Sequence, residues 1–247
     1  MQFVRQVFLG GVMVFCGPLV AAYSSAELTG ESGARDEVDR SASAGGAFEY
    51  RLQTEETARL DDRFPFGYWK VHRVYPVLMS EDQPRAVQVA NKRIVERVHG
   101  YRCDGMGDVT FSTREVFIGN GVLSMTYDAS WMCASMSSPQ SESGFLNLDL
   151  RGGSEIQLED QFRDAAAYEG FRAVAIVALN EELEGRTASD GRRCPPASSM
   201  SGFKVSGGEL VVASFPGQGE NSACDVEAAL PLDSLDDELK PDSSLRL

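Results

Sequence analysis

The chain of 247 residues contains only two histidines, His72 and His99. A Ser-His-Asp site needs an imidazole within hydrogen-bond reach of its nucleophile, and zinc sites draw mainly on His and Cys ligands. His72 lies in a segment with strand character, and His99 lies near the end of a predicted helix, where a histidine is a favourable partner of the helix dipole. No G-x-S-x-G segment is present. We therefore predict no catalytic residue, no metal site and no cofactor, and we expect that the protein is not an enzyme.

Beyond its amino terminus, the chain lacks the run of about 20 apolar residues that a membrane-spanning helix needs. The first residues contain Arg5, an apolar stretch over 7–20, and then small residues that end at Ala22 or Ala26. This order is typical of a signal peptide. We predict a signal peptide over residues 1–26, cleaved after Ala22 or Ala26, and hence a periplasmic or secreted protein. Retention of this segment as an anchor stays open.

Basic residues are outnumbered, with 23 Lys and Arg against 37 Asp and Glu and a net charge of −14. Such a surface repels phosphates, which argues against a nucleic-acid partner. It favours encounter with a cationic partner. The alternative is that the acidic surface serves solubility alone.

Residues 27–47 have no apolar periodicity and are rich in Ser, Gly, Ala and charge. Such a segment cannot bury enough apolar surface to offset its loss of conformational entropy, so we predict a flexible leader. Residues 48–236 have the size of a single domain with its own core. Residues 237–247 are predicted to form an acidic tail, after a short helix that begins near Asp233.

The first half of this domain alternates strand and helix signals. Residues 69–79 are rich in β-branched and aromatic residues, which predicts a strand. Ser80 and Gln83 have capping-box spacing. Apolar residues then recur at helical spacing up to Gly100, which predicts a helix over 82–99; they are Val87, Ala90, Ile94, Val95 and Val98. Residues 109–118 and 122–132 flank an Asn-Gly turn, which is a strong hairpin signal.

The second half repeats this alternation. A strand over 145–150 and a short one over 155–158 flank the turn at Gly152 and Gly153, which predicts a second hairpin. Asp164 can cap a helix that ends at Gly185, with an apolar stripe of Ala167, Phe171, Val174, Ala178 and Leu183. A third hairpin over 202–215 and a strand over 226–232 follow. The predicted fold class is α+β, with an antiparallel sheet built of hairpins and two helices packed on one side.

The chain has no C-x-x-C pair, so its cysteine spacing does not suit zinc. Four cysteines follow the signal peptide, and an even number in an exported protein indicates disulfides. Three pairings are possible. We favour Cys103 with Cys133 and Cys194 with Cys224, because each pair brackets one structural unit. By the loop-entropy model, each bridge contributes about 3 to 4 kcal/mol.

Several phrases, taken in order, resemble a domain found beside bacterial polysaccharide deacetylases of the PdaC type. The resemblance covers about residues 71–235. The phrases are YPV at 75–77 with a helix containing Asn91 and Ile94, GVLSM at 121–125, FLNLDLRGG at 145–153, IQLEDQF at 156–162, FKV at 203–205, LVV at 210–212, and ALPLDSL at 229–235.

A relative of this kind is the extracellular domain of RsiV-type anti-sigma factors, which binds lysozyme. The resemblance therefore implies a cationic, lysozyme-like or other peptidoglycan-cleaving enzyme as partner, which this protein would sense, inhibit or confer immunity to. Two departures matter. Residues 141–144 replace a histidine-containing stretch of the family, and no sigma-binding segment precedes the domain. The alternative function is an accessory cell-wall module that binds peptidoglycan or glycan directly.

Two polar loops are the candidate partner-binding segments, 137–143 and 217–222. A disulfide between Cys194 and Cys224 would hold the second rigid and lower the ordering cost of binding. The carboxylates of Asp149, Glu159 and Asp160 are close in sequence, as a glycoside hydrolase would need, but we interpret them as partners of backbone amides around the 152–153 turn. The candidate binding residues are Ser141, Glu142, Ser143, Gln218, Glu220 and Asn221.

Overall fold

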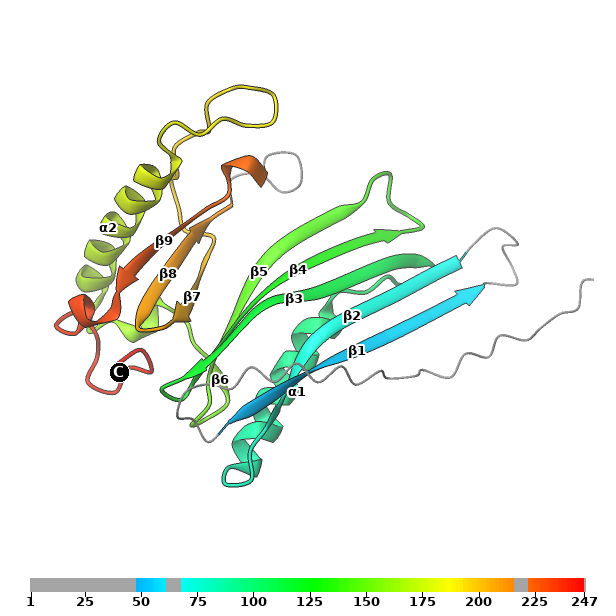
Figure 1. Ribbon diagram of the computed structural model, residues 1–247, viewed down its shortest axis with the longest axis horizontal. Helices are drawn as coiled ribbons and strands as arrows, with labels where there is room; N and C mark the ends of the chain where they lie inside the picture. Colours follow the sequence, from blue (N-terminus) through cyan, green and yellow to red (C-terminus); the bar gives the residue numbers. More distant parts are fainter. Residues whose placement is uncertain (1–47, 61–67, 216–221, 247) are drawn as a thin grey trace, which may run out of the picture.

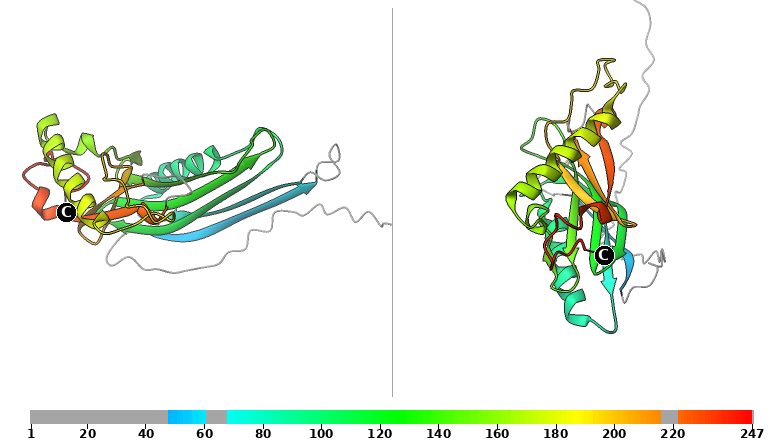
Figure 2. Two further views of the ribbon diagram at one scale, coloured as in Figure 1. Left: turned by 90° about the horizontal axis from the view of Figure 1, so that it is seen from above. Right: turned by 90° about the vertical axis from the view of Figure 1, so that its left-hand side faces the viewer.

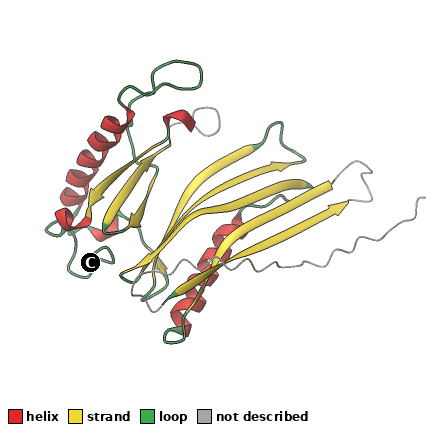
Figure 3. Ribbon diagram, viewed as in Figure 1, coloured by secondary structure: helices red, strands yellow, loops and turns green. Residues whose placement is uncertain are grey.

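The computed structural model describes residues 48–60, 68–215 and 222–246 (Figure 1). The predicted signal peptide over 1–26 and the predicted leader over 27–47 lie outside these residues. Two helices and two sheets confirm the α+β class (Figure 3). No helix of the described segments is long and apolar enough to cross a membrane.

The larger sheet has six strands, which follow one another across the sheet in chain order. They are β1 (Glu49–Leu60), β2 (Tyr68–Met79), β3 (Gly107–Gly119), β4 (Val122–Cys133), β5 (Gln140–Asp149) and β6 (Ser154–Glu155). Neighbours are antiparallel except β2 and β3, which are parallel. Two parallel neighbours need a long crossover connection, and a helix provides it here. The antiparallel sheet predicted from the sequence is therefore corrected at this one pair of strands.

Helix α1 (Pro84–Gly100) makes that connection and lies on one face of the large sheet. It buries Ala90, Ile94 and Val98 against the sheet. Val95, which was predicted in the same stripe, is 38% exposed. The Asn91 side chain exchanges two hydrogen bonds with the backbone of Leu78, at 2.8 and 3.0 Å, and so fixes the middle of the helix against the end of β2.

The hairpin of β3 and β4 turns as predicted, with both Asn120 (φ 54°) and Gly121 (φ 77°) in the left-handed region. A type I′ turn requires these conformations. Both predicted disulfides are present, Cys103–Cys133 and Cys194–Cys224. The first ties the end of β4 to the segment that follows α1.

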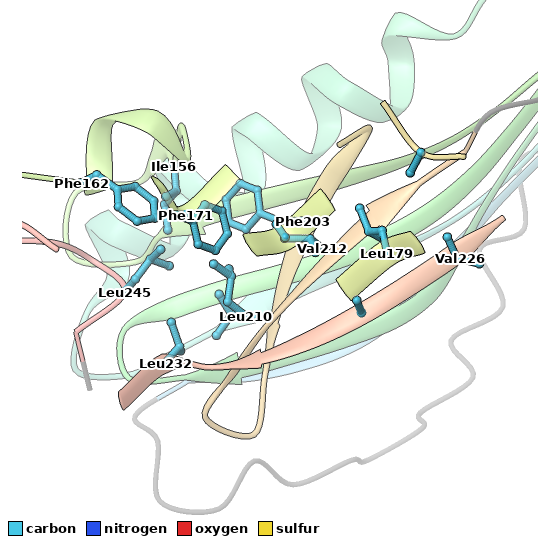
Figure 4. Close-up of a cluster of buried hydrophobic side chains, with 14 of the residues drawn as sticks. Ile156, Phe162, Phe171, Leu179, Phe203, Leu210, Val212, Val226, Leu232 and Leu245 are labelled. Carbon is cyan, nitrogen blue, oxygen red and sulfur yellow. The ribbon is translucent and has the colours of Figure 1, made fainter. Parts of the chain in front are cut away.

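The smaller sheet has three antiparallel strands, β7 (Gly202–Ser206), β8 (Glu209–Ser214) and β9 (Val226–Pro231). Helix α2 (Ala165–Leu183) packs on it, and the Asp164 side chain caps the helix by accepting the Ala167 N–H at 2.8 Å. Phe171 and Leu179 of the helix join Phe203 and Val212 in one apolar core (Figure 4). The buried stripe is Ala167, Phe171, Ala175, Leu179 and Leu183.

Val174 is a correction, because it was expected in this stripe and is 58% exposed. Burial recurs every four residues along α2, which leaves Val174 on the flank of the helix.

Side chains of the large sheet join the two sheets. The Asn147 amide donates to the Phe203 carbonyl at 2.8 Å, and the Val205 N–H donates to Ser124 Oγ at 2.9 Å. These are backbone groups at the outer edge of β7, so the large sheet satisfies an edge that would otherwise be left unpaired. Lys204 lies between Glu115 and Glu227, at 2.6 and 2.8 Å.

The last described residues pack against the smaller sheet. The short helix η3 (Leu232–Leu235) confirms the helix predicted near Asp233. Leu239 and Leu245, in the segment predicted as an acidic tail, are 3% and 1% exposed and belong to the core of the smaller sheet. Ser244 Oγ lies 2.9 Å from Asp149 Oδ2 and 3.0 Å from the Arg151 guanidinium.

Candidate binding surface on the large sheet

The large sheet is longer than the helix that covers it. Strands β1 to β4 have 12 or 13 residues and therefore extend about 40 Å. The 17 residues of α1 extend only about 25 Å. The strands continue well beyond the helix (Figures 1 and 2). We call this end the distal half of the sheet; it comprises residues 54–58, 70–74, 108–112, 128–133 and 140–143.

Glu55 of β1 gathers partners on the helix-side face of this region. His99 Nε2 lies 3.2 Å and Arg73 Nη1 lies 3.8 Å from Glu55 Oε2, and the Tyr75 hydroxyl donates to Glu55 Oε1. Burial, together with the bond to Glu55, raises the pKa of Tyr75 well above its usual range. Tyr75 thus stays a neutral donor, and the group fixes β1 and β2 to the end of α1.

A second group continues across the sheet. Arg97 donates to Tyr127 Oη at 3.1 Å and to Glu155 Oε1 at 3.0 Å. Tyr101 Oη lies 3.1 Å from Tyr127 Oη and donates to Glu142 Oε1 at 2.9 Å. Each hydroxyl can accept one hydrogen bond and donate the next, so the order of donation is Arg97, Tyr127, Tyr101, Glu142. We call the two groups together the polar belt.

Electrostatics of the belt favour hydrogen bonding over proton transfer. Burial, with hydrogen bonds to Tyr127 and Glu142, raises the pKa of Tyr101 far above its usual range. Burial opposes the charge on Arg97, but Tyr127 and Glu155 outweigh it and the pKa of Arg97 is raised. A neutral phenol and a permanent cation can orient a ligand or a neighbour, but neither can act as a general base near neutral pH.

Aromatic rings lie beside the belt. The Tyr101 ring centroid is 5.4 Å from that of Trp131 and 5.8 Å from that of Phe111, and Phe111 stacks on Tyr127 at 4.9 Å. Trp131 remains partly exposed. Gly144 is required here, because a Cβ at this position would lie 2.4 Å from Tyr127 Oη.

The opposite face of the distal half is polar. Ser143 Oγ donates to Asp128 Oδ1 at 2.6 Å, and Arg114 pairs with Asp128 Oδ2 at 3.3 Å. His72 Nδ1 lies 3.0 Å from Glu56 Oε1. This face is open to solvent, and Asp108, Thr110, Ser130, Met132 and Ser141, which share it, are exposed.

Ser141, Glu142 and Ser143 lie in strand β5, which corrects their prediction as part of a loop. They pair with Ser130, Ala129 and Asp128 of β4. Because side chains alternate along a strand, Ser141 and Ser143 lie on the open face and Glu142 lies on the helix-side face. The sequence did not predict this part of the strand because its residues are polar, and serines are typical of loops. Gln218, Glu220 and Asn221 lie outside the described residues.

The two histidines do not form one site. Their partners Glu55 and Glu56 are consecutive residues of a strand, so His99 and His72 lie on opposite faces of the sheet. Asp149 accepts the Arg151 N–H at 2.9 Å, which confirms its predicted role at the turn. Within the described part of the chain, no group of three His, Cys, Asp or Glu side chains is placed to hold a metal ion.

The polar belt was not found from the sequence. Tyr127, Ala129 and Trp131 alternate along β4, and this spacing could have shown that two aromatic residues share a face. The partners Arg97 and Glu155, which come from α1 and β6, could not be assigned without the fold.

No family model matches the chain, and no curated protein does so either. Solved structures that are similar to the chain include two DUF3298 proteins. A DUF3298 family protein from Pseudomonas aeruginosa PAO1 superposes with a TM-score of 0.52 at 14% identity, covering 78% of this chain and 95% of that one. A DUF3298 family member from Bacteroides fragilis NCTC 9343 has a TM-score of 0.49 at 13% identity, covering 80% and 95%. The first likeness shows that the α+β fold is one that a bacterial DUF3298 protein also has.

Proposed function

We propose that the protein is an exported, non-enzymatic binding protein of the bacterial cell envelope that recognises a cationic protein partner through the distal half of the large sheet. The observation that carries the proposal is the length of this sheet beyond α1. The helix-side face of the distal half buries Val109, Phe111 and Ala129. The opposite face is covered by no described element and exposes Asp108, Thr110, Ser130, Met132 and Ser141 to solvent.

The distal half is rigid before it binds. The Cys103–Cys133 bridge fixes the end of β4, and the polar belt ties five strands to the end of α1. A surface that is already ordered loses little conformational entropy on binding. The disulfides also fit an oxidising compartment, as export through the predicted signal peptide would provide.

Charge favours a cationic partner. Ten of the described basic residues are in ion pairs with carboxylates: Arg73, Lys92, Arg93, Arg97, Arg114, Arg151, Arg163, Arg172, Arg192 and Lys204. Exposed carboxylates such as Asp104, Glu181 and Asp233 have no such pair among the described residues. Unpaired carboxylates on the surface, in a chain with a net charge of −14, attract cationic molecules and steer them toward the protein.

The resemblance to RsiV-type domains suggests which class of basic protein the partner belongs to. A basic lysozyme or another peptidoglycan-cleaving enzyme would meet an envelope protein in the compartment that both occupy. Its recognition would let this protein act as an inhibitor, a sensor or an immunity protein.

Calorimetric titration with a basic lysozyme, at low and at high salt, tests this function. We expect saturable heat at low salt and an affinity that falls steeply as salt screens the charges. The variant Ser141→Arg should lower the affinity at least tenfold, while the matched variant Ser199→Arg, on an exposed loop of the smaller unit, should keep it. Absence of heat at low salt, or equal affinity of both variants, contradicts the proposal.

A second function is favoured by one observation, the partly exposed Trp131 beside Tyr101 and Glu142. An aromatic face next to planar polar groups is suited to stack a sugar ring. Sedimentation with purified sacculi tests this alternative. Trp131→Ala should then abolish cosedimentation, and Met132→Ala, on the opposite face, should leave it unchanged; retention of binding by Trp131→Ala rules out the glycan site.

A further inference from the structure

Strand β1 forms one edge of the large sheet, and no described strand pairs with its outer side (Figure 1). It has 12 residues, contains neither proline nor lysine, and pairs with β2 in one unbroken register. Edge strands are usually short, or carry a proline, a lysine or a bulge that prevents pairing with another chain. β1 lacks these features. It does carry other charged side chains, and the order of these charges decides which strand can pair with it.

Contacts of β2 show which backbone groups of β1 point outward. The Leu78 N–H and C=O are bonded to the Asn91 side chain, at 2.8 and 3.0 Å, and not to β1. Hydrogen-bonded pairs alternate along an antiparallel ladder, so every second residue of β2 counted from Leu78 also points away from β1. Pro76, which has no N–H to donate, fits this alternation. The β1 residues opposite such positions direct their N–H and C=O groups outward, and they include Leu52, Thr54, Glu56 and Ala58.

Charge at this edge differs from the charge of the whole chain. The described side chains of β1 and β2 include three carboxylates and three permanent cations, namely Glu49, Glu55, Glu56, Arg51, Lys70 and Arg73. The net charge of −14 is therefore carried by other parts of the molecule. Surface charges separated by more than about 8 Å are largely screened at physiological ionic strength. The edge thus does not repel a second copy of itself, and it has no excess of carboxylates that would select a cationic strand.

The order of charges along β1 is complementary to itself. When two copies of β1 are placed antiparallel about Gln53, Arg51 of each copy lies opposite Glu55 of the other. Opposite charges at facing positions stabilise a strand pair, and like charges destabilise it. A centre at Leu52 would place Glu49 opposite Glu55, and a centre at Glu55 would place this residue opposite itself. The facing charges therefore favour self-pairing in the register about Gln53.

We propose that two copies of this chain pair through β1, antiparallel about Gln53, and form a twofold-symmetric dimer with one continuous sheet. Leu52 of each copy exchanges its outward backbone hydrogen bonds with Thr54 of the other. Because both copies use the same edge, the contact closes at two chains. The pairing uses the edge of the sheet and not its open face, so the dimer does not depend on the partner proposed above.

Sedimentation velocity of the full chain over a range of concentrations tests this dimer. We expect a monomer–dimer equilibrium in the parent protein. Thr54→Pro removes an N–H that points outward, and edge strands tolerate proline at such positions. This variant should therefore fold and lose at least tenfold in dimer affinity, whereas Thr54→Val keeps the N–H and should dimerise like the parent. Arg51→Glu, which faces Glu55 of the other copy, should also weaken the dimer.

Two further measurements separate pairing from folding. Circular dichroism should show cooperative unfolding of Thr54→Pro. Amide exchange of the parent protein should slow at Leu52, Thr54 and Glu56 as its concentration rises, which tests the pairing even if the proline variant does not fold. Ser141→Arg, a substitution in β5, should dimerise like the parent even if the lysozyme titration fails.

Three results would overturn the proposal. The first is a monomer at every concentration, and the second is a dimer that Thr54→Pro retains. The third is protection of the outward β1 amides only when a basic lysozyme is added, which would assign this edge to a strand of another protein.

Discussion

The small sheet with α2 and the distal half of the large sheet are stabilised in different ways. The first buries a contiguous apolar core that contains Phe171, Leu179 and Leu210. The second buries few side chains, among them Val109 and Phe111, on its helix-side face, leaves its other face open, and relies on the polar belt and one disulfide. Apolar burial gives most of the folding free energy, whereas a polar network fixes geometry and leaves surface accessible. Under the proposed function, stability and recognition would therefore depend on different parts of the molecule.

The largest effect on stability should come from the apolar core. Phe171 is 4% exposed and lies among the buried rings of that core. Phe171→Ala should lower the free energy of unfolding by about 3 to 5 kcal/mol. Urea denaturation measures this loss; a loss below that of any substitution in the polar belt would reverse the comparison.

Removal of the two disulfides should separate stability from binding. Both bridges join residues 30 apart, so the loop-entropy model gives each about 3 to 4 kcal/mol. We expect two double variants to lose similar amounts of unfolding free energy, namely Cys103→Ala with Cys133→Ala and Cys194→Ala with Cys224→Ala. Only the loss of the Cys103–Cys133 bridge should also weaken binding of the cationic partner. Equal losses of affinity in both double variants would mean that the distal half has no particular role in binding.

The polar joint between the sheets should have an intermediate effect. Asn147 is buried and bonds both Ser124 and the β7 backbone. Asn147→Ala should cost about 1 to 3 kcal/mol. Combined with Ser124→Ala the loss should be less than the sum, because the two side chains share one network. Strict additivity in chemical denaturation would show that the joint does not act as a unit.

A substitution in the polar belt should lower the free energy of unfolding by less than Asn147→Ala does. Tyr101→Phe keeps the ring contacts and removes the hydroxyl that bonds Glu142 and Tyr127. We expect a loss of about 1 kcal/mol and faster amide exchange in β5 near Glu142. Unchanged exchange there would argue that the belt does not stiffen the distal half.

The smallest effect depends on pH and concerns Asp149. Burial alone would raise its pKa, but the Arg151 and Ser244 hydrogen bonds outweigh burial and lower it below the ordinary value of 3.8. The carboxylate therefore stabilises the fold above the unfolded pKa, and this contribution is lost as the pH falls through the lower folded pKa. The stability difference between the parent and Asp149→Asn should shrink from pH 6 to pH 3. A constant difference would assign the loss to geometry instead of charge.

Much of the fold was predictable because local signals agreed with tertiary structure. The Asn120-Gly121 turn, the Asp164 cap and the disulfide pairing each rest on a nearby pattern that the fold respects. Strand β1 was missed, because its Glu, Gln, Arg and Thr residues lack apolar alternation. The Ser141 segment was taken for a loop for a similar reason. The polar belt joins residues up to 58 positions apart, and no local pattern can report such a contact.

Hydrogen exchange of the full chain with and without a basic lysozyme tests the central claim most directly. We expect slower exchange at residues 128–133 and 140–143 in the complex, with the core of the smaller sheet unchanged. Protection absent from these strands, or confined to α2 and the smaller sheet, would contradict the assignment of recognition to the distal half.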